Sequence, residues 1–453
     1  MGKLVVILLL PFSVFALSVE NTLQSDSLLK QEVLADSTTS EPKSVPFQDS
    51  DIEKLLIDPD NLVSDDFAIP EYFKDATTFW FDIYTQHPSS HSVLHDKDNL
   101  ALVYDVLDFS SVHSSELNQF TKSALQVKYV EKIVSRYKTA FNQLSLGKPA
   151  GEIGAKIIEA LERAKIKLPS KKRRKNFYNE LSTALRAQTG QKDNIQAGIN
   201  SFAVYEKTIK TYFDAFDVPW ELKAIPFLES SFNVRARSKV GASGVWQFMR
   251  WIGGHFMPLS RRQDGRLQPL MATASALHLL KQNLKILGRW DLAIAAYNSG
   301  TKHLLKGKRQ LVANKKEYSL ANILENYEHE HLGFASKNFF AEFLALTRAL
   351  AYKDKIFTKP KTNDQIIYAY VSLCSIKPNW FFKLMKKFDD NIIEENRHFE
   401  RKYFNHSFPR GTILFTSSDL TPSRYVKIEP SMMTKRFPKN WEVFTKGYKC
   451  STK

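Results

Sequence analysis

A single carboxylate ends an apolar run in the stretch FLESSF, residues 227–232. Glu229 follows AIPFL, so its helical turn is expected to be largely buried, and burial disfavours the charged form of a carboxyl group. A carboxyl that stays protonated near neutral pH can act as a general acid. This stretch alone nevertheless favours an ordinary explanation: a charge at a helix end, or one half of a buried ion pair with an arginine.

A second segment, SKVGASGVWQFM at residues 238–249, combines glycines with aromatic and amide side chains. Gly241 and Gly244 allow a close approach of the backbone to a ligand. Trp246 and the phenylalanine two residues later offer flat faces that suit sugar rings, and the amide of Gln247 can recognise hydroxyl or acetamido groups. A glycine turn that leads into a helix with aromatic core packing would give the same pattern.

A third segment, AAYNSG at residues 295–300, brings Tyr297 and Asn298 to the end of an expected helix. An asparagine before a terminal glycine is often a capping residue. A buried tyrosine hydroxyl needs a hydrogen-bond partner, and Glu229 would serve. The three segments therefore supply candidates for one site, although their spacing does not establish that they meet.

Taken together and in this order, Glu229–Ser230, residues 238–249 and residues 295–300 resemble the catalytic domain of the soluble lytic transglycosylases. This is a glycoside hydrolase family with a lysozyme-like fold. The wording GVWQFM is similar to the D-type branch of the membrane-bound lytic murein transglycosylases. The resemblance covers residues 190–355.

The resemblance implies a reaction. These enzymes cleave the β-1,4 bond between N-acetylmuramic acid and N-acetylglucosamine in peptidoglycan. Glu229 would first donate a proton to the glycosidic oxygen and then act as a base, while the C6 hydroxyl of the muramic residue closes onto C1. The product is a 1,6-anhydro sugar. One carboxylate suffices because the nucleophile belongs to the substrate, whereas an ordinary glycosidase uses two.

The resemblance also implies roles for five other side chains and a partner. Ser238 would lie in the cleft near the N-acetyl or peptide-bearing group. Gln247 and Met249 would line the glycan cleft, and Tyr297 and Asn298 would support the catalytic carboxyl and the sugar beside it. The expected partners are peptidoglycan glycan strands. No cofactor, metal or nucleic acid is expected.

Three features depart from the family pattern. Phe334 stands where we expect a tyrosine, which removes one hydroxyl from the site. Gln268 stands where an aspartate is usual, and we expect this to affect loop structure more than chemistry. Recognisable wall-binding repeats are missing, although residues 365–416 are interpreted as a degenerate relative of such a repeat.

Three other functions stay open. One is a muramidase of the same fold that uses water, with Asp264 as the evident second acid. Another is a catalytically weak glycan-binding or scaffold protein, which Phe334 favours. The third is a basic nucleic-acid binder, against which the export signal argues. The mass of the products separates the first from a transglycosylase, because an anhydro product is lighter by one water.

The helices that must position these groups are marked by proline, aspartate and glycine. DVPWELKAIPFLES is expected to form one helix, with Asp217 as its N-cap, Pro219 in its first turn and a bend at Pro226. Further helices are expected over residues 269–288, 291–300 and 336–352.

These patterns predict a mainly α protein. The expected parts are a signal peptide at 1–18, a flexible acidic linker at 19–70, a helical accessory region at 71–195, the lysozyme-like catalytic domain at 196–356, and a small mixed α+β module with a basic tail at 357–453. Cys374 and Cys450 would pair only if their Cα atoms come within reach, which spacing does not settle.

The chain of 453 residues carries a formal net charge of +16, and such a field attracts polyanions, among them acidic cell-wall polymers. The densest basic run, KKRRK at residues 171–175, is interpreted as a solvated loop after Pro169. HEH at residues 329–331 has no accompanying ligand cluster, so metal binding is not predicted.

The first residues predict export. Lys3 precedes a short apolar stretch with small residues at a cleavage position, as in a secretory signal. No later stretch is long and apolar enough to span a membrane, so no transmembrane helix is expected after signal removal. The mature protein is expected in the periplasm or cell envelope, or secreted.

Overall fold

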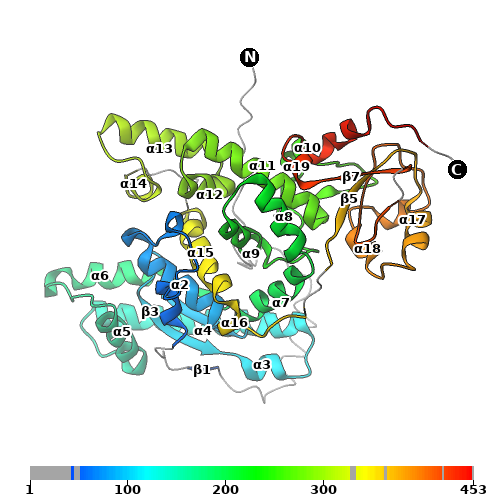
Figure 1. The fold of residues 1–453 in the computed structure, drawn as a ribbon. Helices are drawn as coiled ribbons and strands as arrows, with labels where there is room; N and C mark the ends of the chain where they lie inside the picture. The colour runs from blue at the N-terminus through cyan, green and yellow to red at the C-terminus, as the bar shows by residue number, and fades with distance from the viewer. Residues whose placement is uncertain (1–41, 45–50, 327–332, 362–364, 421–422, 451–453) are drawn as a thin grey trace.

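The computed structural model describes residues 42–44, 51–326, 333–361, 365–420 and 423–450, and it confirms a mainly α protein (Figure 1). The predicted signal peptide lies outside these residues. Among the described helices, none is long and apolar enough to cross a membrane.

The accessory region is an α/β module rather than the helical one predicted. Its four-stranded sheet has the order β1-β3-β2-β4, with antiparallel neighbours. The strands are β1 (Lys43–Ser44), β2 (His91–Asp96), β3 (Val103–Asp108) and β4 (Leu185–Thr189). The helices are α2 (Lys74–Thr85), α3 (Ser110–Ser114), α4 (Gln119–Ser145), α5 (Gly151–Arg163) and α6 (Lys171–Ala184). We refer to β1 together with residues 74–189 as the accessory module.

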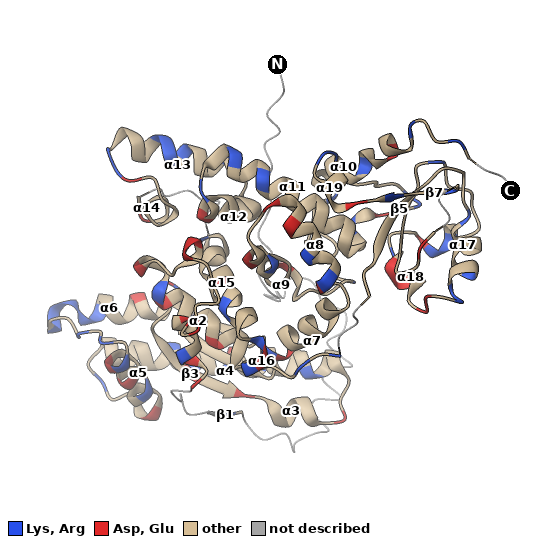
Figure 2. Cartoon of the chain, in the orientation of Figure 1, with Lys and Arg blue, Asp and Glu red and all other residues tan. Residues whose placement is uncertain are grey.

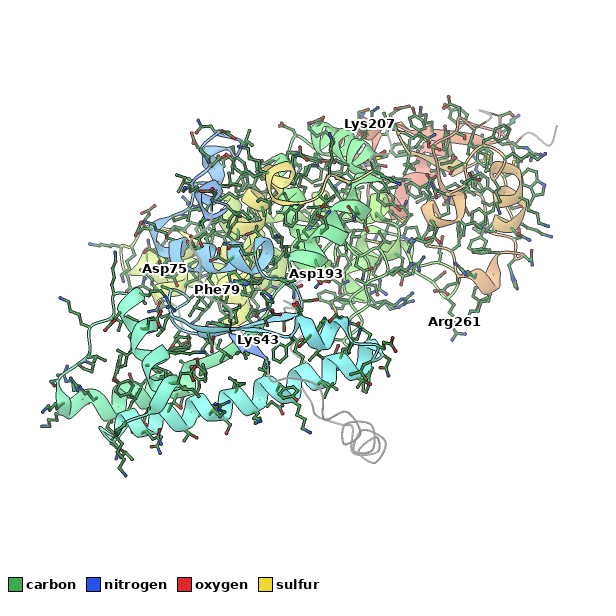
Figure 3. The ribbon with its side chains drawn as sticks, turned by 90° about the horizontal axis from the view of Figure 1, so that it is seen from below. Lys43, Asp75, Phe79, Asp193, Lys207 and Arg261 are labelled. Atoms are coloured by element: carbon green, nitrogen blue, oxygen red, sulfur yellow. A yellow bond between two sulfur atoms is a disulfide. The ribbon has the colours of Figure 1, made fainter. Side chains whose placement is uncertain are left out.

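The two central strands, β2 and β3, were not predicted because they lack the alternation that marks a half-buried strand. Five of the six residues of β2 are buried, since helices cover both faces. Seen from below, α4 runs along the outer side of the module, while Phe79 and Asp193 lie where the module meets the rest of the chain (Figure 3). There, the backbone N–H and hydroxyl of Ser89 donate to the carboxylate of Asp193 at 2.7 and 2.6 Å.

The end of the predicted linker is ordered. Residues 51–73 form the short helices η1 (Glu53–Ile57), η2 (Asp65–Phe67) and η3 (Glu71–Phe73). Leu56 and Phe67 are buried, and their carbonyls accept hydrogen bonds from the guanidinium of Arg348 at 2.9 and 3.0 Å. The linker prediction is wrong for this part because a few well-placed apolar residues anchor an acidic segment.

The basic run KKRRK forms the first turns of α6 instead of a loop. Ser170 precedes the helix, and lysine and arginine are good helix formers. Figure 2 shows the positive charges gathered at this end of α6.

Residues 192–356 form a helical region, as predicted for 196–356, wherever the structure describes them. The elements are α7 (Lys192–Ala203), α8 (Glu206–Phe216), η4 (Trp220–Lys223), α9 (Ala224–Ser230), α10 (Arg250–Phe256), η5 (Gly265–Leu267), α11 (Pro269–Leu287), α12 (Trp290–Ser299), α13 (Thr301–Ala313), α14 (Leu320–Asn326), α15 (Phe334–Ala351) and α16 (Lys353–Ile356). The helix α15 packs against α2, α9 and α12 and joins the accessory module to this region.

The helix ends agree only in part with the sequence prediction. Pro269 opens α11 and Gly288 caps it with φ 80°, as expected. Asp217, however, ends α8 in a left-handed conformation (φ 51°) instead of starting the next helix. The expected single helix is divided into η4 and α9, so Pro226 lies near the start of α9, where its missing N–H costs little.

The C-terminal module, residues 365–450, is small and mixed, as predicted. Its sheet has the order β6-β5-β7. The elements are β5 (Tyr368–Ser372), α17 (Pro378–Met385), α18 (Ile392–Glu395), η6 (Arg401–Tyr403), β6 (Ile413–Thr416), β7 (Tyr425–Ile428), α19 (Pro430–Met433) and η7 (Pro438–Thr445). Cys374 and Cys450 form a disulfide, with Cα atoms 5.2 Å apart.

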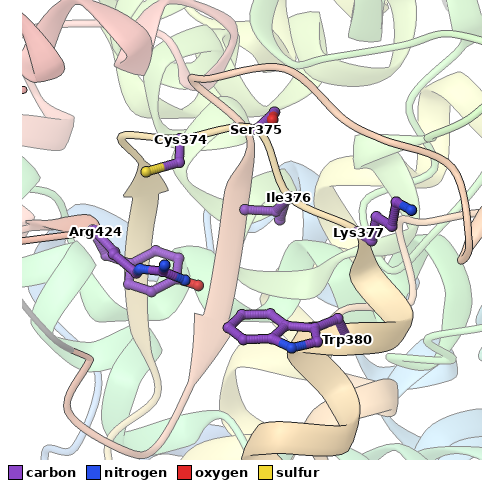
Figure 4. Close-up of a pocket in the computed structure, with 7 residues that line it drawn as sticks. Cys374, Ser375, Ile376, Lys377, Trp380 and Arg424 are labelled. Atoms are coloured by element: carbon purple, nitrogen blue, oxygen red, sulfur yellow. The ribbon is translucent and has the colours of Figure 1, made fainter. Parts of the chain in front are cut away.

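The C-terminal module also contains a hollow of about 250 Å³ between the end of β5, the start of α17 and the start of β7 (Figure 4). The indole of Trp380, which is half exposed, and the guanidinium of Arg424 line it, with 5.7 Å between the guanidinium carbon and the ring centroid.

Candidate active site

Glu229 lies in the last turn of α9, which ends in an unusual backbone conformation. Ser231 and Phe232 both have positive φ, 48° and 50°. Non-glycine residues adopt this conformation only where the surroundings impose it. Here Gly198 of α7 faces the turn: a Cβ at this position would lie 2.3 Å from the carbonyl oxygen of Ser231. Close packing of α7 therefore fixes the turn and, with it, the direction of Glu229.

Glu229 is half-buried as a residue, and protein atoms surround its carboxyl group. Burial raises its pKa to about 8, and the nearby carboxyl of Glu342 contributes in the same direction. Desolvation disfavours the charged form, as anticipated for an acid at the end of an apolar run. At neutral pH Glu229 therefore carries a proton that it can donate.

The loop of residues 238–249 lies directly against α9. The hydroxyl of Ser230 donates to the carbonyl of Val245 at 3.0 Å. Gly244 has φ 76°, and a Cβ there would lie 1.8 Å from the carbonyl oxygen of Arg266. The close approach that requires this glycine is therefore to η5, within the protein, and not to a ligand. Gly241, with φ 91°, faces open space.

The side chain of Arg266 binds the loop of residues 238–249 through two backbone carbonyls. Its guanidinium makes a two-pronged pair with Asp264, at 2.9 and 2.8 Å, and also donates to the carbonyls of Gly241 and Phe248 at 2.7 and 3.0 Å. Burial works to raise the pKa of Asp264, but the hydrogen bonds and charge of Arg266 hold that pKa below its ordinary value. Asp264, the suggested second acid of a water-using enzyme, is therefore committed to a structural ion pair.

Three of the predicted cleft residues lie on this loop. Gln247 has φ 45°, and its amide donates to the carbonyl of Gly244 at 2.7 Å, within the loop. The hydroxyl of Ser238 accepts a hydrogen bond from the backbone N–H of Ala242 at 2.9 Å and closes the preceding turn. Met249 caps α10 and is partly buried against the core. These residues lie on the loop that Ser230 of α9 contacts, and their contacts with a glycan remain predictions.

The aromatic residues of the loop do not serve as sugar platforms, which corrects the sequence interpretation. Trp246 and Phe248 are each only 1% exposed. The indole of Trp246 donates to the hydroxyl of Thr273 at 2.9 Å, in the core. These residues instead follow the alternative that was left open, a glycine turn with aromatic packing.

Tyr297 and Asn298, at the end of α12, are both buried. The hydroxyl of Tyr297 donates to the carbonyl of Trp246 at 2.8 Å, so its partner is the loop and not the carboxyl of Glu229. Burial raises the pKa of Tyr297 well above its ordinary value, and the charge of nearby Glu229 adds to this. Asn298 accepts a hydrogen bond from the hydroxyl of Ser336 at 3.1 Å, which ties α12 to α15.

Gln268, which stands where the family usually has an aspartate, has a structural role, as expected. Its side-chain oxygen accepts from the backbone N–H of Met271 at 2.7 Å and caps α11. Its amide nitrogen donates to the carbonyl of Glu395 at 3.0 Å, in the C-terminal module. An aspartate could make only the first of these two bonds.

A second buried acid beside Glu229 was missed by the sequence reasoning. Glu342, on α15, is 0% exposed, and burial raises its pKa to about 8 against the opposing influence of Tyr84 and Arg186. The hydroxyl of Tyr84 donates to its Oε2 at 2.9 Å. A charged residue inside the apolar run NFFAEFLALTRAL was the available signal.

Phe334, the expected tyrosine position, faces the accessory module. The guanidinium of Arg186 lies 4.5 Å above its ring, and the rings of Trp80 and His95 lie 6.4 and 6.1 Å away. Within the described residues no group of three or more His, Cys, Asp or Glu side chains could hold a metal ion. The HEH motif lies outside them.

Part of the chain is similar in sequence to known proteins. Residues 192–320 match the Transglycosylase SLT domain. A stretch of 151 residues is 27% identical to the membrane-bound lytic murein transglycosylase D of Escherichia coli strain K12, covering 33% of this chain and 32% of that protein. The protein of the same name from E. coli O6:H1 matches equally well. The chain thus spans about a third of the length of these relatives.

The matched residues include α9, the loop that contacts it and α12, so every side chain that the sequence put forward for the site falls inside them. The chain therefore contains a domain of the transglycosylase SLT family, which spans residues 192–320 and holds Glu229.

Proposed function

We propose that the protein is a lytic transglycosylase that cleaves the bond between N-acetylmuramic acid and N-acetylglucosamine in peptidoglycan and forms a 1,6-anhydro end. One observation carries this proposal. Glu229, within the matched domain, is a half-buried acid, and burial of its carboxyl raises the pKa to about 8. A proton donor that is still protonated at neutral pH is the group that such a cleavage requires first.

The proposed reaction needs only this one protein group. The carboxyl of Glu229 gives its proton to the glycosidic oxygen as the bond from C1 to that oxygen breaks. The resulting carboxylate then removes the proton from the C6 hydroxyl of the muramic residue, whose oxygen forms a bond to C1. The proton returns to Glu229, no water is consumed, and no cofactor is involved.

Other residues of the site are assigned supporting roles in this proposal. Ser238, Gln247 and Met249 contact the glycan, and Tyr297 and Asn298 hold the loop and α15 around the carboxyl. The bond from Tyr297 to Trp246 supports this, because it links α12 to the loop that lies against α9.

A water-using muramidase is the second candidate, but its suggested acid, Asp264, is paired with Arg266. A glycan-binding protein without activity is the third. Both are outcomes of the experiment below.

The proposed place of action is the cell envelope. The E. coli relatives are by name membrane-bound and act on murein. For this chain we infer the periplasm or cell envelope, or secretion, from the export signal in residues 1–18, and a polymer bearing carboxylates suits the net charge of +16.

Digestion of purified sacculi tests the proposal. We expect the protein to release muropeptides that are lighter by one water than those released by a muramidase, and we expect Glu229→Gln to reduce the rate of release by about 10²–10⁴-fold. Products of ordinary mass would support the muramidase. Binding without release, or a rate of release that Glu229→Gln leaves unchanged, would overturn the proposed mechanism.

A further inference from the structure

Glu342 occupies a position where an acid is costly. The helix α15 runs through the core, and the side chains around Glu342 on this helix, Phe339, Phe340, Phe343 and Leu344, are buried apolar groups. Removing a carboxylate from water without full compensation costs several kcal/mol, on the order of the net stability of a domain. A buried acid that only fills space would be better replaced by an apolar residue.

The accessory module supplies a partner for this acid. The helices α2 and α15 pack side by side, and two hydrogen bonds join them one turn apart. The indole of Trp80 donates to Asn338 at 3.3 Å, and the hydroxyl of Tyr84 donates to Oε2 of Glu342 at 2.9 Å. Both helices use positions four residues apart, which share one helix face. The carboxyl of Glu342 is therefore fixed in direction by another part of the chain.

The second carboxyl oxygen of Glu342, Oε1, is buried and is not used in a hydrogen bond among the described residues. The helix that carries Glu229, α9, packs against α15, and the two carboxyls are close enough for Glu342 to affect the protonation of Glu229. Two carboxyls in one water-poor environment resist simultaneous ionisation and titrate as a pair.

The charged and titratable groups that face Glu342 come from three elements: Tyr84 from α2, Arg186 from β4 and Glu229 from α9. Tyr84 and Arg186 favour the ionised form of Glu342, whereas burial disfavours it. Arg186 is held in place by the ring of Phe334, and its buried Nε has no partner among the described residues. Nearby His95 is expected to be neutral, because burial lowers its pKa to about 4.

We propose that Glu342 is a positioning residue of the active site: held by Tyr84 of the accessory module, it takes the negative charge of the carboxyl pair and so extends the pH range in which Glu229 keeps its proton. This inference rests on the proposed function. It makes the accessory module part of the catalytic machinery, although that module lies outside the matched domain, residues 192–320.

The direction of the effect follows from the pairing. As pH rises, the pair loses its first proton, and the neighbours of Glu342 direct the charge there. Glu229 then stays protonated until the second proton leaves. With glutamine at position 342 this charge is absent, so Glu229 loses its proton at a lower pH.

The pH dependence of sacculus digestion by the full chain tests the proposal. Glu342→Gln is expected to move the alkaline limb of kcat/KM down by about one pH unit, the lower end of the shift that a neighbouring carboxylate causes. The matched control is Thr347→Val, because Thr347 is buried on the same helix and its hydroxyl has no partner among the described residues. This variant should keep the wild-type limb.

The variant Tyr84→Phe tests how much the hydrogen bond from the accessory module contributes to the effect of Glu342 on the alkaline limb. Removing its hydrogen bond disfavours charge on Glu342, so the limb should move down by a smaller amount. Added to Glu342→Gln, the same change should have no further effect. The proposal is overturned if Glu342→Gln leaves the limb in place, or if it lowers kcat/KM equally at every pH. If the wild-type protein releases no anhydro product, the proposed function itself has failed, and this is recognised before any variant is compared.

Discussion

Glu229 and Asp264 are the two acids that the sequence suggested as catalytic, and the fold shifts their pKa values in opposite directions. Glu229 ends α9 beside a second carboxyl, and burial raises its pKa to about 8. Asp264 precedes η5, where the buried guanidinium of Arg266 holds its pKa below the ordinary value. The comparison teaches that burial alone does not make an acid catalytic. The partner decides whether the carboxyl keeps its proton or serves as a structural anion.

The largest effect on stability is expected from breaking the paired acid. Arg266→Met leaves a buried carboxylate without its charged partner and removes one hydrogen-bond donor from each of the carbonyls of Gly241 and Phe248. The free energy of unfolding should fall by about 3–5 kcal/mol. Denaturant titration measures this. The control is Arg289→Met: the Arg289 side chain is half exposed in its pair with Asp291, and the pair should contribute about 0–1 kcal/mol. Equal losses in the two variants would mean that the Asp264–Arg266 pair has no special role.

A smaller loss is expected at the glycine that packs on this pair. Gly244→Ala places a Cβ where the carbonyl oxygen of Arg266 lies only 1.8 Å away, in a backbone with φ 76°. We expect a loss of roughly 1–3 kcal/mol, from strain and displacement of the loop. Gly241→Ala is the matched control, since its φ of 91° carries the same strain while its surroundings are open. If both variants lose the same stability, the close packing on Arg266 is not what requires glycine.

The smallest expected effect is on the pH dependence of stability. It distinguishes most clearly a buried acid with a raised pKa from one with a lowered pKa. The pKa of Glu342 is about 8 in the folded protein and ordinary in the unfolded chain, so the folded state binds more protons between these values. Stability from this group is present below the unfolded pKa and is lost as pH rises through 8. Glu342→Gln should therefore raise Tm relative to wild type increasingly from pH 5 to pH 9.

Asp264 should show the opposite sign. Its folded pKa is lowered, so its contribution is present above the unfolded pKa and is lost on acidification through the folded pKa. The loss of Tm in Asp264→Asn should therefore shrink at acid pH. Thermal unfolding of both variants over one pH series checks the pair, and parallel pH profiles would contradict the difference between the two acids.

Much of the central region was predictable from the sequence because its signals are local. Helical periodicity predicted the all-helical region, and Pro269 and Gly288 marked the ends of α11. Glu229 was found because an acid at the end of an apolar run next to a glycine-rich segment is an unusual local pattern. Tyr297 and Asn298 lie at the end of a helix, as the sequence predicted.

What the sequence could not give depends on contacts between distant segments. The central strands β2 and β3 of the accessory module are largely buried, so they lack alternation. Trp246 and Phe248 offered the same pattern for a sugar platform and for core packing, and only the fold distinguishes the two. The role proposed for Glu342 depends on its hydrogen bond with Tyr84, which lies 258 residues earlier in the chain. The role of Gly244 likewise depends on Arg266, which no spacing rule connects to it.

The most direct test of the central claim compares the two acids by the rate of muropeptide release from the same sacculi. Glu229→Gln should reduce this rate by about 10²–10⁴-fold, the usual contribution of a general acid and base. Asp264→Asn, assayed under conditions where it remains folded, should stay within about tenfold of wild type and still release anhydro products, since its partner makes Asp264 a structural anion. A folded Glu229→Gln variant that keeps its rate, or a folded Asp264→Asn variant that loses it, would contradict the assignment of Glu229 as the single catalytic acid.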